Sequence, residues 1–114
     1  AYTGTLAALY AGAAFVPLNP TFPAEKSAAM IARADLDAII VDATCLPQLV
    51  AVLGEDSELC VVAPEALASD LPTLGGRIID REALAAHPPL DPPLALTPED
   101  TAYLLFTSGS TGVP

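Results

Sequence analysis

The sequence has few positive charges, histidines and cysteines, and each shortage excludes a class of function. Lys and Arg account for only 4 of the 114 residues, against 14 Asp and Glu, so the formal net charge is −10. Four separated cations cannot form the basic stripe that follows a phosphate backbone, and we expect no nucleic-acid binding. The acidic residues are scattered, and one histidine and two cysteines without a CxxC spacing form no metal-ligand pattern. We therefore expect no metal site within the chain.

Long apolar runs and a basic leader are also missing. No segment approaches the roughly 18–20 apolar residues needed to span a bilayer, and the most apolar stretch, residues 6–18, contains Gly12 and Pro17. No basic n-region precedes a cleavage site, so we expect a cytoplasmic protein without membrane association. In that compartment Cys45 and Cys60 are expected to be reduced, mostly buried thiols, and a disulfide is the alternative.

Short β-prone segments alternate with helical segments along the chain. Strands are predicted at residues 14–18, 38–41, 59–62 and 77–79, and helices at 1–11, 23–34, 45–53, 64–68 and 80–86. This alternation predicts an α/β domain with a mainly parallel sheet. Because the chain opens inside a helix, we expect residues 1–114 to be a single partial domain, a fragment of a larger one.

Two helices have predicted ends and faces. The helix at 23–34 should begin with Pro23 at its first position, and its inward-facing residues should be Ala28, Ile31 and Ala32. The helix at 45–53 should be capped by Thr44 and end at Gly54.

The strand at 38–41 is a continuous apolar run, which is typical of a strand with both sheet faces covered. Further along, residues 87–98 contain five prolines, which favour an extended, stiff crossing segment. A turn at residues 97–100 should then lead into a buried strand at 102–106.

The chain ends in a loop of small polar residues that directly follows this strand. Its glycines can adopt positive φ, and its N–H and hydroxyl groups can form a concave site for an anion such as phosphate. The alternative is a flexible Ser/Gly linker. The candidate phosphate-binding residues are Thr107, Ser108, Gly109, Ser110, Thr111 and Gly112. Neither a GxxxxGK[ST] phosphate loop nor a GxSxG nucleophile elbow is present.

No residue is expected to be catalytic within the chain. His87 lies against two prolines, and a Ser-His-Asp triad would require that segment to fold over the terminal loop. Asp42, Asp80 and Asp91 are interpreted as turn and surface residues.

The terminal segment carries a resemblance to a known family. Residues 102–114, AYLLFTSGSTGVP, resemble the ATP-binding signature of the adenylate-forming (AMP-binding) enzymes, which include nonribosomal peptide synthetase adenylation domains, acyl-CoA ligases and luciferases. Residues 9–20, LYAGAAFVPLNP, resemble the preceding motif of the amino-acid adenylation branch. The two motifs stand in the family's order, so the resemblance covers nearly the whole chain.

This resemblance implies a reaction for the parent enzyme. A carboxylate, here an amino acid, attacks the α-phosphate of MgATP to give an acyl-adenylate and pyrophosphate, and the acyl group passes to the phosphopantetheine thiol of a carrier protein or to coenzyme A. Residues 107–112 would hold the β- and γ-phosphates. The fragment alone is expected to be inactive.

The chain also departs from the family pattern. The lysine and glycine that follow the proline in the family lie beyond Pro114, and Asn19 replaces a more frequent Asp. Because Asn-Pro is also common in acyl-CoA ligases, a carboxylic acid–CoA ligase is an alternative parent. An alternative of another class is a non-catalytic α/β interaction module.

Overall fold

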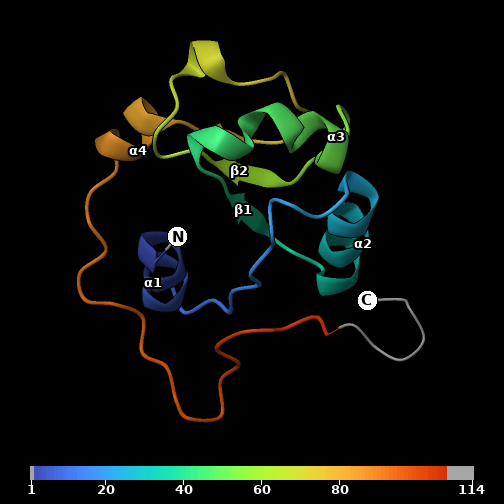
Figure 1. The fold of residues 1–114 in the computed structure, drawn as a ribbon. Helices are drawn as coiled ribbons and strands as arrows, with labels where there is room; N and C mark the ends of the chain where they lie inside the picture. The colour runs from blue at the N-terminus through green and yellow to red at the C-terminus, as the bar shows by residue number, and fades with distance from the viewer. Residues whose placement is uncertain (1, 108–114) are drawn as a thin grey trace. The chain divides into compact units, whose positions relative to one another are not determined.

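Three short parallel strands form the sheet of this protein. The structure is a computed structural model that describes residues 2–107. The strands β1 (Ala38–Ile40), β2 (Cys60–Val62) and β3 (Ile78–Ile79) lie in the order β1-β2-β3 (Figure 1). The ladder pairs Ile39 with Val61 and Val61 with Ile78. Helical segments connect the strands, so the predicted α/β class with a mainly parallel sheet is confirmed.

The chain divides into two compact units, and each is described by itself. The central unit is residues 19–87 and contains the sheet; the terminal unit combines residues 1–18 with residues 88–114. Among the residues that the structure describes, no helix is long and apolar enough to cross a membrane.

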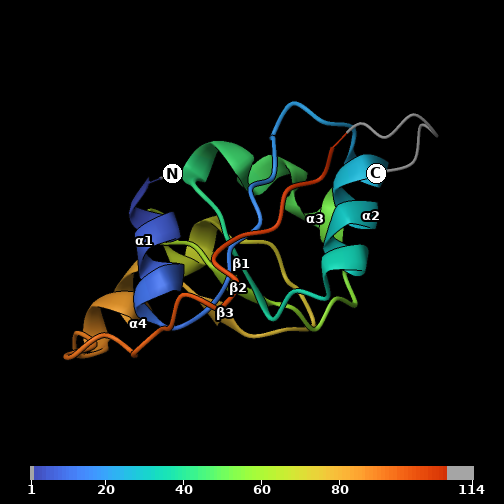
Figure 2. The ribbon, with the colours of Figure 1, turned by 90° about the horizontal axis from the view of Figure 1, so that it is seen from below.

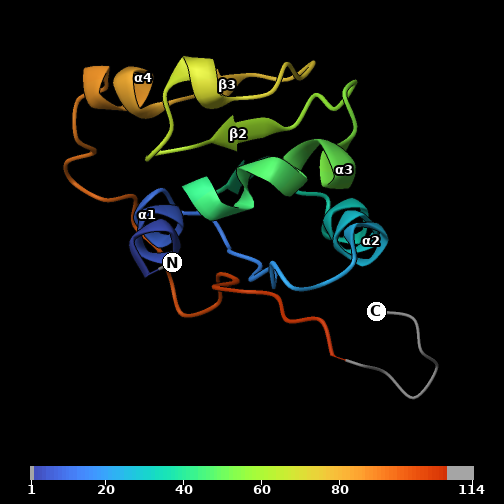
Figure 3. The ribbon, with the colours of Figure 1, turned by 45° about the horizontal axis from the view of Figure 1, so that its top comes forward.

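The core of the central unit lies on one face of the sheet. Val61 is completely buried in the middle strand, and the 3₁₀-helix η1 (Ala43–Gln48) and the short helix α3 (Leu49–Leu53) pack across it (Figure 3). The buried members of this core are Val41, Leu49, Val61, Ala63 and Ala66. Since side chains alternate along a strand, Ile39 and Val41 point into this core, whereas Ile40 between them is 45% exposed. The prediction that the 38–41 strand has both faces covered is therefore wrong within this unit.

Helix α2 (Ala24–Ala34) lies beside α3 (Figures 1 and 2). It begins one residue later than predicted, with Pro23 as its N-cap, and ends at Asp35, which adopts the left-handed conformation with φ 50°. Its buried residues are Ser27 and Met30, so the predicted inward face of Ala28, Ile31 and Ala32 is wrong by about one position.

The predicted helix at 45–53 is two shorter elements. Pro47 lies inside η1, and because proline has no N–H to donate, a regular α-helix cannot run through it. The cap is Asp42 and not Thr44. The predicted end at Gly54 is confirmed.

The remaining helical segments of the central unit are short. The helix predicted at 64–68 is wrong: residues 64–67 form no helix, and a 3₁₀ turn, η2 (Ala68–Asp70), follows them. The carboxylate of Asp70 accepts a hydrogen bond from the Leu67 N–H at 3.2 Å, which places the turn after the predicted segment. Helix α4 (Arg81–Ala86) agrees with the prediction, with Asp80 as its N-cap.

The described part of the terminal unit, residues 2–18 and 88–107, has one helix and one bridge between extended segments. Helix α1 (Tyr2–Tyr10) agrees with the predicted helix. A parallel bridge joins Phe15 to Tyr103, and the strands predicted at 14–18 and 102–106 are otherwise extended segments without further strand pairing among the described residues.

Candidate functional site

The segment that leads to the terminal loop is hydrogen-bonded to the earlier motif. The N–H of Phe15 donates to the carbonyl of Ala102 at 3.1 Å, and the N–H of Leu104 donates to the carbonyl of Phe15 at 3.0 Å. The rings of Phe15 and Tyr103 lie with centroids 5.7 Å apart and planes tilted by 33°. The two motifs recognised in the sequence therefore meet side by side, although 88 positions separate their paired residues.

The strand predicted at 102–106 is extended but not buried. Tyr103 is 54% and Leu105 63% exposed, and only Phe106 is half-buried. Successive residues of an extended chain point to opposite sides, so both sides of this segment are open. The prediction of a buried strand is wrong for the described structure.

A hydrogen-bonded turn at residues 97–100 immediately precedes the segment 102–106. The N–H and the hydroxyl of Thr97 both donate to the carboxylate of Asp100, at 2.7 and 3.1 Å, and the Asp100 N–H donates back to the Thr97 carbonyl at 3.1 Å. These reciprocal bonds close the turn through both side chains and confirm the turn predicted at 97–100. That Asp100 closes this turn was not predicted from the sequence. The signal available for it was an Asp three positions after a Thr, the spacing at which the carboxylate can accept the hydrogen bonds of Thr97.

The proline-rich segment is anchored to the end of α1. The N–H of Leu94 donates to the carbonyl of Tyr10 at 2.9 Å, and Gly12, with φ 74°, follows the helix end. A Cβ at Gly12 would lie 3.3 Å from the Leu94 Cβ. Glycine is thus required there both for the left-handed backbone and for the close approach of the segment. Residues 88–97 are exposed and form neither helix nor strand, but the chain bends at Asp91 and Pro92, so the extended course predicted for residues 87–98 is interrupted there.

The candidate phosphate-binding residues begin just after the segment that is hydrogen-bonded to Phe15. Thr107 is exposed and belongs to no helix or strand, and it follows the segment paired with Phe15. The other five candidates, Ser108, Gly109, Ser110, Thr111 and Gly112, lie outside the described residues. The role of all six in binding phosphate stays a prediction.

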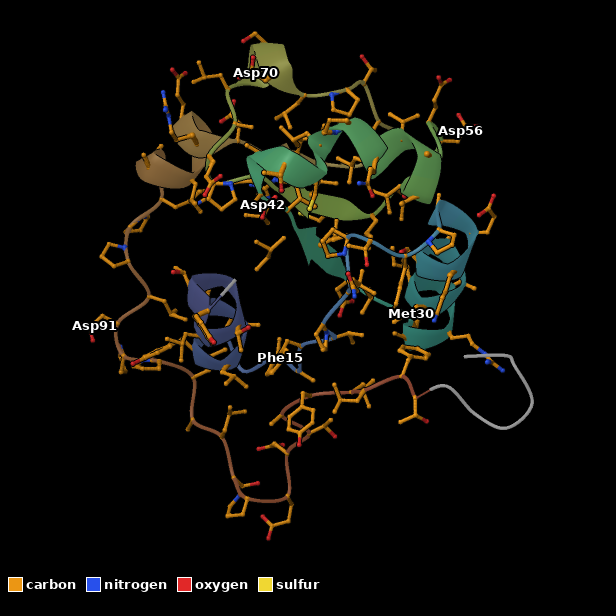
Figure 4. All side chains as sticks on the ribbon, in the orientation of Figure 1. Phe15, Met30, Asp42, Asp56, Asp70 and Asp91 are labelled. Atoms are coloured by element: carbon orange, nitrogen blue, oxygen red, sulfur yellow. The ribbon has the colours of Figure 1, made fainter. Side chains whose placement is uncertain are left out.

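Acidic side chains at the carboxyl ends of the strands are used as helix caps. Asp42 Oδ1 accepts from the N–H groups of Thr44 and Cys45, at 3.0 and 3.1 Å, and from the Thr44 hydroxyl at 2.6 Å (Figure 4 shows Asp42 beside η1). Asp80 Oδ1 accepts from the Ala83 N–H at 2.7 Å. These bonds satisfy N–H groups that the first turn of a helix leaves free, which confirms the structural interpretation of both aspartates.

The hydrogen bonds around Asp42 also change its acidity. Donation from the Thr44 and Cys45 side chains lowers the pKa of the Asp42 carboxyl below its ordinary value of 3.8. The pKa of the Cys45 thiol is raised, first by burial and then by its hydrogen bond to Asp42. Both cysteines are free and half-buried in the structure, so neither is as buried as predicted, and their reduced state stays a prediction.

Neither a triad nor a metal centre is formed by the residues that the structure describes. His87 is exposed and follows the last turn of α4, where its N–H donates to the Leu84 carbonyl at 3.2 Å. Within residues 2–107, no group of three or more His, Cys, Asp and Glu side chains could hold a metal ion.

Comparison with known proteins decides the family. The family model described as AMP-binding enzyme matches residues 1–114. The chain belongs to the AMP-binding enzyme family. Its relatives among curated proteins include synthetases of peptides, and a crystal structure of IdnL7 is similar over 94% of this chain and 21% of that chain, with a TM-score of 0.78 and 44% identity.

Three relatives indicate the branch of the AMP-binding enzymes. The chain is 35% identical over 114 residues to N-(5-amino-5-carboxypentanoyl)-L-cysteinyl-D-valine synthase of Streptomyces clavuligerus, covering 96% of the chain and 13% of the relative. Nonribosomal peptide synthetase 4 of Gibberella zeae is 34% identical over 109 residues, with 96% and 1% covered. Phosphinothricin tripeptide synthetase PhsC of Streptomyces viridochromogenes is 32% identical over 114 residues, with 100% and 9% covered. The chain thus spans between 1% and 13% of the length of these three relatives.

Proposed function

We propose that this chain is part of the large N-terminal region of an amino-acid adenylation domain in a nonribosomal peptide synthetase. The observation that carries the proposal is the family match over the whole chain, combined with relatives that are peptide synthetases. The hydrogen-bonded pairing of the 9–20 motif with the 102–114 motif supports it, because this pairing directs the chain toward the candidate loop. Residues 1–114 would then be a single partial domain of the longer polypeptide.

The proposed reaction joins a carboxylate to AMP. A carboxylate oxygen of the amino acid attacks the α-phosphorus of ATP, the bond to the bridging oxygen breaks, and pyrophosphate leaves. The aminoacyl group then passes to the phosphopantetheine thiol of a carrier protein, and AMP is released. N–H and hydroxyl donors held where phosphate charge accumulates would stabilise the departing pyrophosphate, and we assign this role to Thr107, Ser108, Gly109, Ser110, Thr111 and Gly112.

Magnesium would accompany ATP in the parent enzyme, and nothing among the described residues singles out a ligand for it. No group of three or more possible metal-ligating side chains occurs within residues 2–107. We therefore assign this chain no Mg²⁺ ligand and propose no step through the ion. We also propose that the 114 residues alone are catalytically inactive.

The branch within the family depends on the acid that is activated. Asn19 replaces the more usual Asp of the amino-acid branch, and its Oδ1 accepts from the Thr21 N–H at 2.9 Å and from the Thr21 hydroxyl at 2.8 Å. An aspartate oxygen would accept the same two bonds. The substitution thus has a structural explanation that leaves the amino-acid branch as the preferred proposal.

Exchange of labelled pyrophosphate into ATP tests the proposed function in the full-length polypeptide. We expect exchange that depends on one amino acid or a small set of them. Exchange supported only by a carboxylic acid without an amino group, with transfer to coenzyme A, would favour the carboxylic acid–CoA ligase. An absence of exchange with every acid of both kinds would contradict both and favour a non-catalytic interaction module.

A further inference from the structure

The turn at residues 97–100 is closed by three hydrogen bonds between its first and last residues. The Asp100 carboxylate accepts from the Thr97 N–H at 2.7 Å and from the Thr97 hydroxyl at 3.1 Å, and the Asp100 N–H donates to the Thr97 carbonyl at 3.1 Å. Pro98 occupies the second position, where its fixed φ suits a β-turn. The ends of the turn are therefore held together by backbone and side chains, although all four residues are exposed.

This turn lies between two points at which the chain is bonded to residues 10–15. The Leu94 N–H donates to the Tyr10 carbonyl at 2.9 Å before the turn, and the Phe15 N–H donates to the Ala102 carbonyl at 3.1 Å after it. Only one residue, Thr101, separates the turn from Ala102. A slip of the segment by one residue would exchange the sides to which its side chains point, and a closed turn leaves little slack for such a slip.

Burial does not hold the segment after the turn in place. Tyr103 is 54% and Leu105 63% exposed, and the last backbone bond to Phe15 comes from the Leu104 N–H at 3.0 Å. Three residues of extended chain span about 10 Å, so a pivot of about 10° at Leu104 would move Thr107 by roughly 2 Å. A displacement of about 1 Å can cost an enzyme on the order of 10²-fold in rate. The direction of the segment therefore matters to whatever follows it.

We propose that Asp100 is a positioning residue for the loop at 107–112. By closing the turn, its carboxylate holds residues 102–106 in the register and direction that present the loop to the β- and γ-phosphates of ATP. Asp100 contacts no substrate in this assignment and acts through the backbone of the segment. The inference rests on the proposed function, because it concerns the loop to which phosphate binding is assigned there.

A positioning role has a kinetic signature that a role in general stability lacks. Without the turn bonds, the segment would populate several arrangements, and only a fraction of them would place the loop correctly. The apparent affinity for a ligand falls in proportion to that fraction, so ATP and pyrophosphate should bind more weakly. Binding of the amino acid, which does not depend on this loop, should not change. A general loss of folded enzyme would instead lower kcat and leave every KM as it was.

Amino-acid-dependent pyrophosphate exchange by the full-length polypeptide tests this assignment. We expect Asp100→Ala to raise the KM values for ATP and pyrophosphate about three- to tenfold, the range expected when one hydrogen bond is lost. The KM for the amino acid should stay at its wild-type value. The matched control is Glu99→Ala, which removes the same charge from the same exposed turn. Within residues 2–107 the Glu99 side chain forms no hydrogen bond, so all three KM values should be retained.

Two milder variants separate the bonds of the turn and serve also where Asp100→Ala fails to fold. Asp100→Asn keeps an oxygen that can accept from the Thr97 N–H, and it should restore most of the ATP affinity that Asp100→Ala loses. Thr97→Val keeps the N–H but removes the hydroxyl bond. Its KM for ATP should rise, but less than that of Asp100→Ala.

The outcomes distinguish this assignment from the proposed function. Exchange by the wild-type protein with an unchanged KM for ATP in Asp100→Ala would overturn the assignment and leave the proposed function standing. A fall in kcat alone, or an equal rise of the KM for ATP in Glu99→Ala, would also overturn it, because these indicate lost folded enzyme or a charge effect. An absence of exchange in the wild-type protein with every amino acid would overturn the proposed function and this assignment together.

Discussion

At the scale of the residue, Asp42 combines a cap with a lowered pKa. Its carboxylate accepts three hydrogen bonds at the start of η1, two of them from Thr44. A carboxylate that accepts such bonds is favoured in its ionised form, which is why its pKa lies below 3.8. Its contribution to folding therefore depends on pH.

The sign of this dependence gives the first prediction. Because the pKa is lower in the folded protein, the ionised Asp42 stabilises the fold above its unfolded pKa, and this stabilisation is lost as the pH falls through the folded pKa. Asp42→Asn preserves the cap but removes the ionisation. In urea unfolding at pH 7 and near pH 3, we expect the wild-type protein to lose more stability than Asp42→Asn. Parallel losses in the two proteins would contradict this role.

Gly76 is constrained by the neighbouring backbone. A Cβ at this position would lie 2.6 Å from the Glu58 carbonyl carbon and 2.7 Å from its oxygen, and it would also overlap the Leu59 carbonyl oxygen. Backbone atoms cannot move aside as a flexible side chain can. We expect Gly76→Ala to lower the free energy of unfolding by about 1–3 kcal/mol, as measured by denaturant titration.

Gly75 provides the matched control. Its added Cβ would lie 3.2 Å from the carbonyl oxygens of Asp56 and Ser57, a tight contact that a small shift relieves. Gly75→Ala should therefore cost less than Gly76→Ala. The reverse order would show that the approach at Gly76 is not the limiting contact.

At the scale of the element, the side of α2 that is buried depends on the surface it packs against and not on its own sequence alone. Met30 is 3% exposed, whereas Ile31 is half-buried. Because removal of a buried side chain leaves a cavity, we expect Met30→Ala to destabilise the protein by about 3 kcal/mol and Ile31→Ala by about 1 kcal/mol. Thermal or urea unfolding of both variants measures the difference, and an equal or larger loss for Ile31→Ala would favour the inward face predicted from the sequence.

Local sequence predicted most elements because each has a local cause. The β-branched segments at β1 and β2, the glycine after α3 and the helix α4 were all predicted, to within one or two residues at each end. Errors arose where two local signals compete. Pro47 outweighed the helical composition of 45–53, and Asp42 accepted the capping bonds that Thr44 was expected to accept.

At the scale of the whole molecule, the pairing of distant segments could not be derived from periodicity. Phe15 and Tyr103 are joined by backbone hydrogen bonds and ring contact, but nothing local in either segment specifies the partner. The order of the two family motifs gave the only signal. Burial of residues 103–105 was predicted from their apolar character, yet burial depends on a covering surface, which these residues lack in the described structure.

The candidate loop requires a test in the full-length polypeptide, because its phosphate-binding role depends on the complete site. Glycine at position 109 would let the backbone approach the phosphates closely, and a β-branched side chain would prevent this. We expect Gly109→Val to lower pyrophosphate exchange by at least about tenfold, since the loss of one well-placed donor to such a charge costs about 10²–10³-fold. The melting temperature should stay within a few degrees of wild type.

Ala102→Val provides the control for this prediction. Ala102 is exposed, precedes the loop in the same segment and contributes its carbonyl to the bond from Phe15. A β-branched side chain suits an extended segment, so exchange should be retained. Undiminished exchange in Gly109→Val would remove the loop from the phosphate site, whereas equal losses in both variants would point to a general disturbance of the segment paired with Phe15.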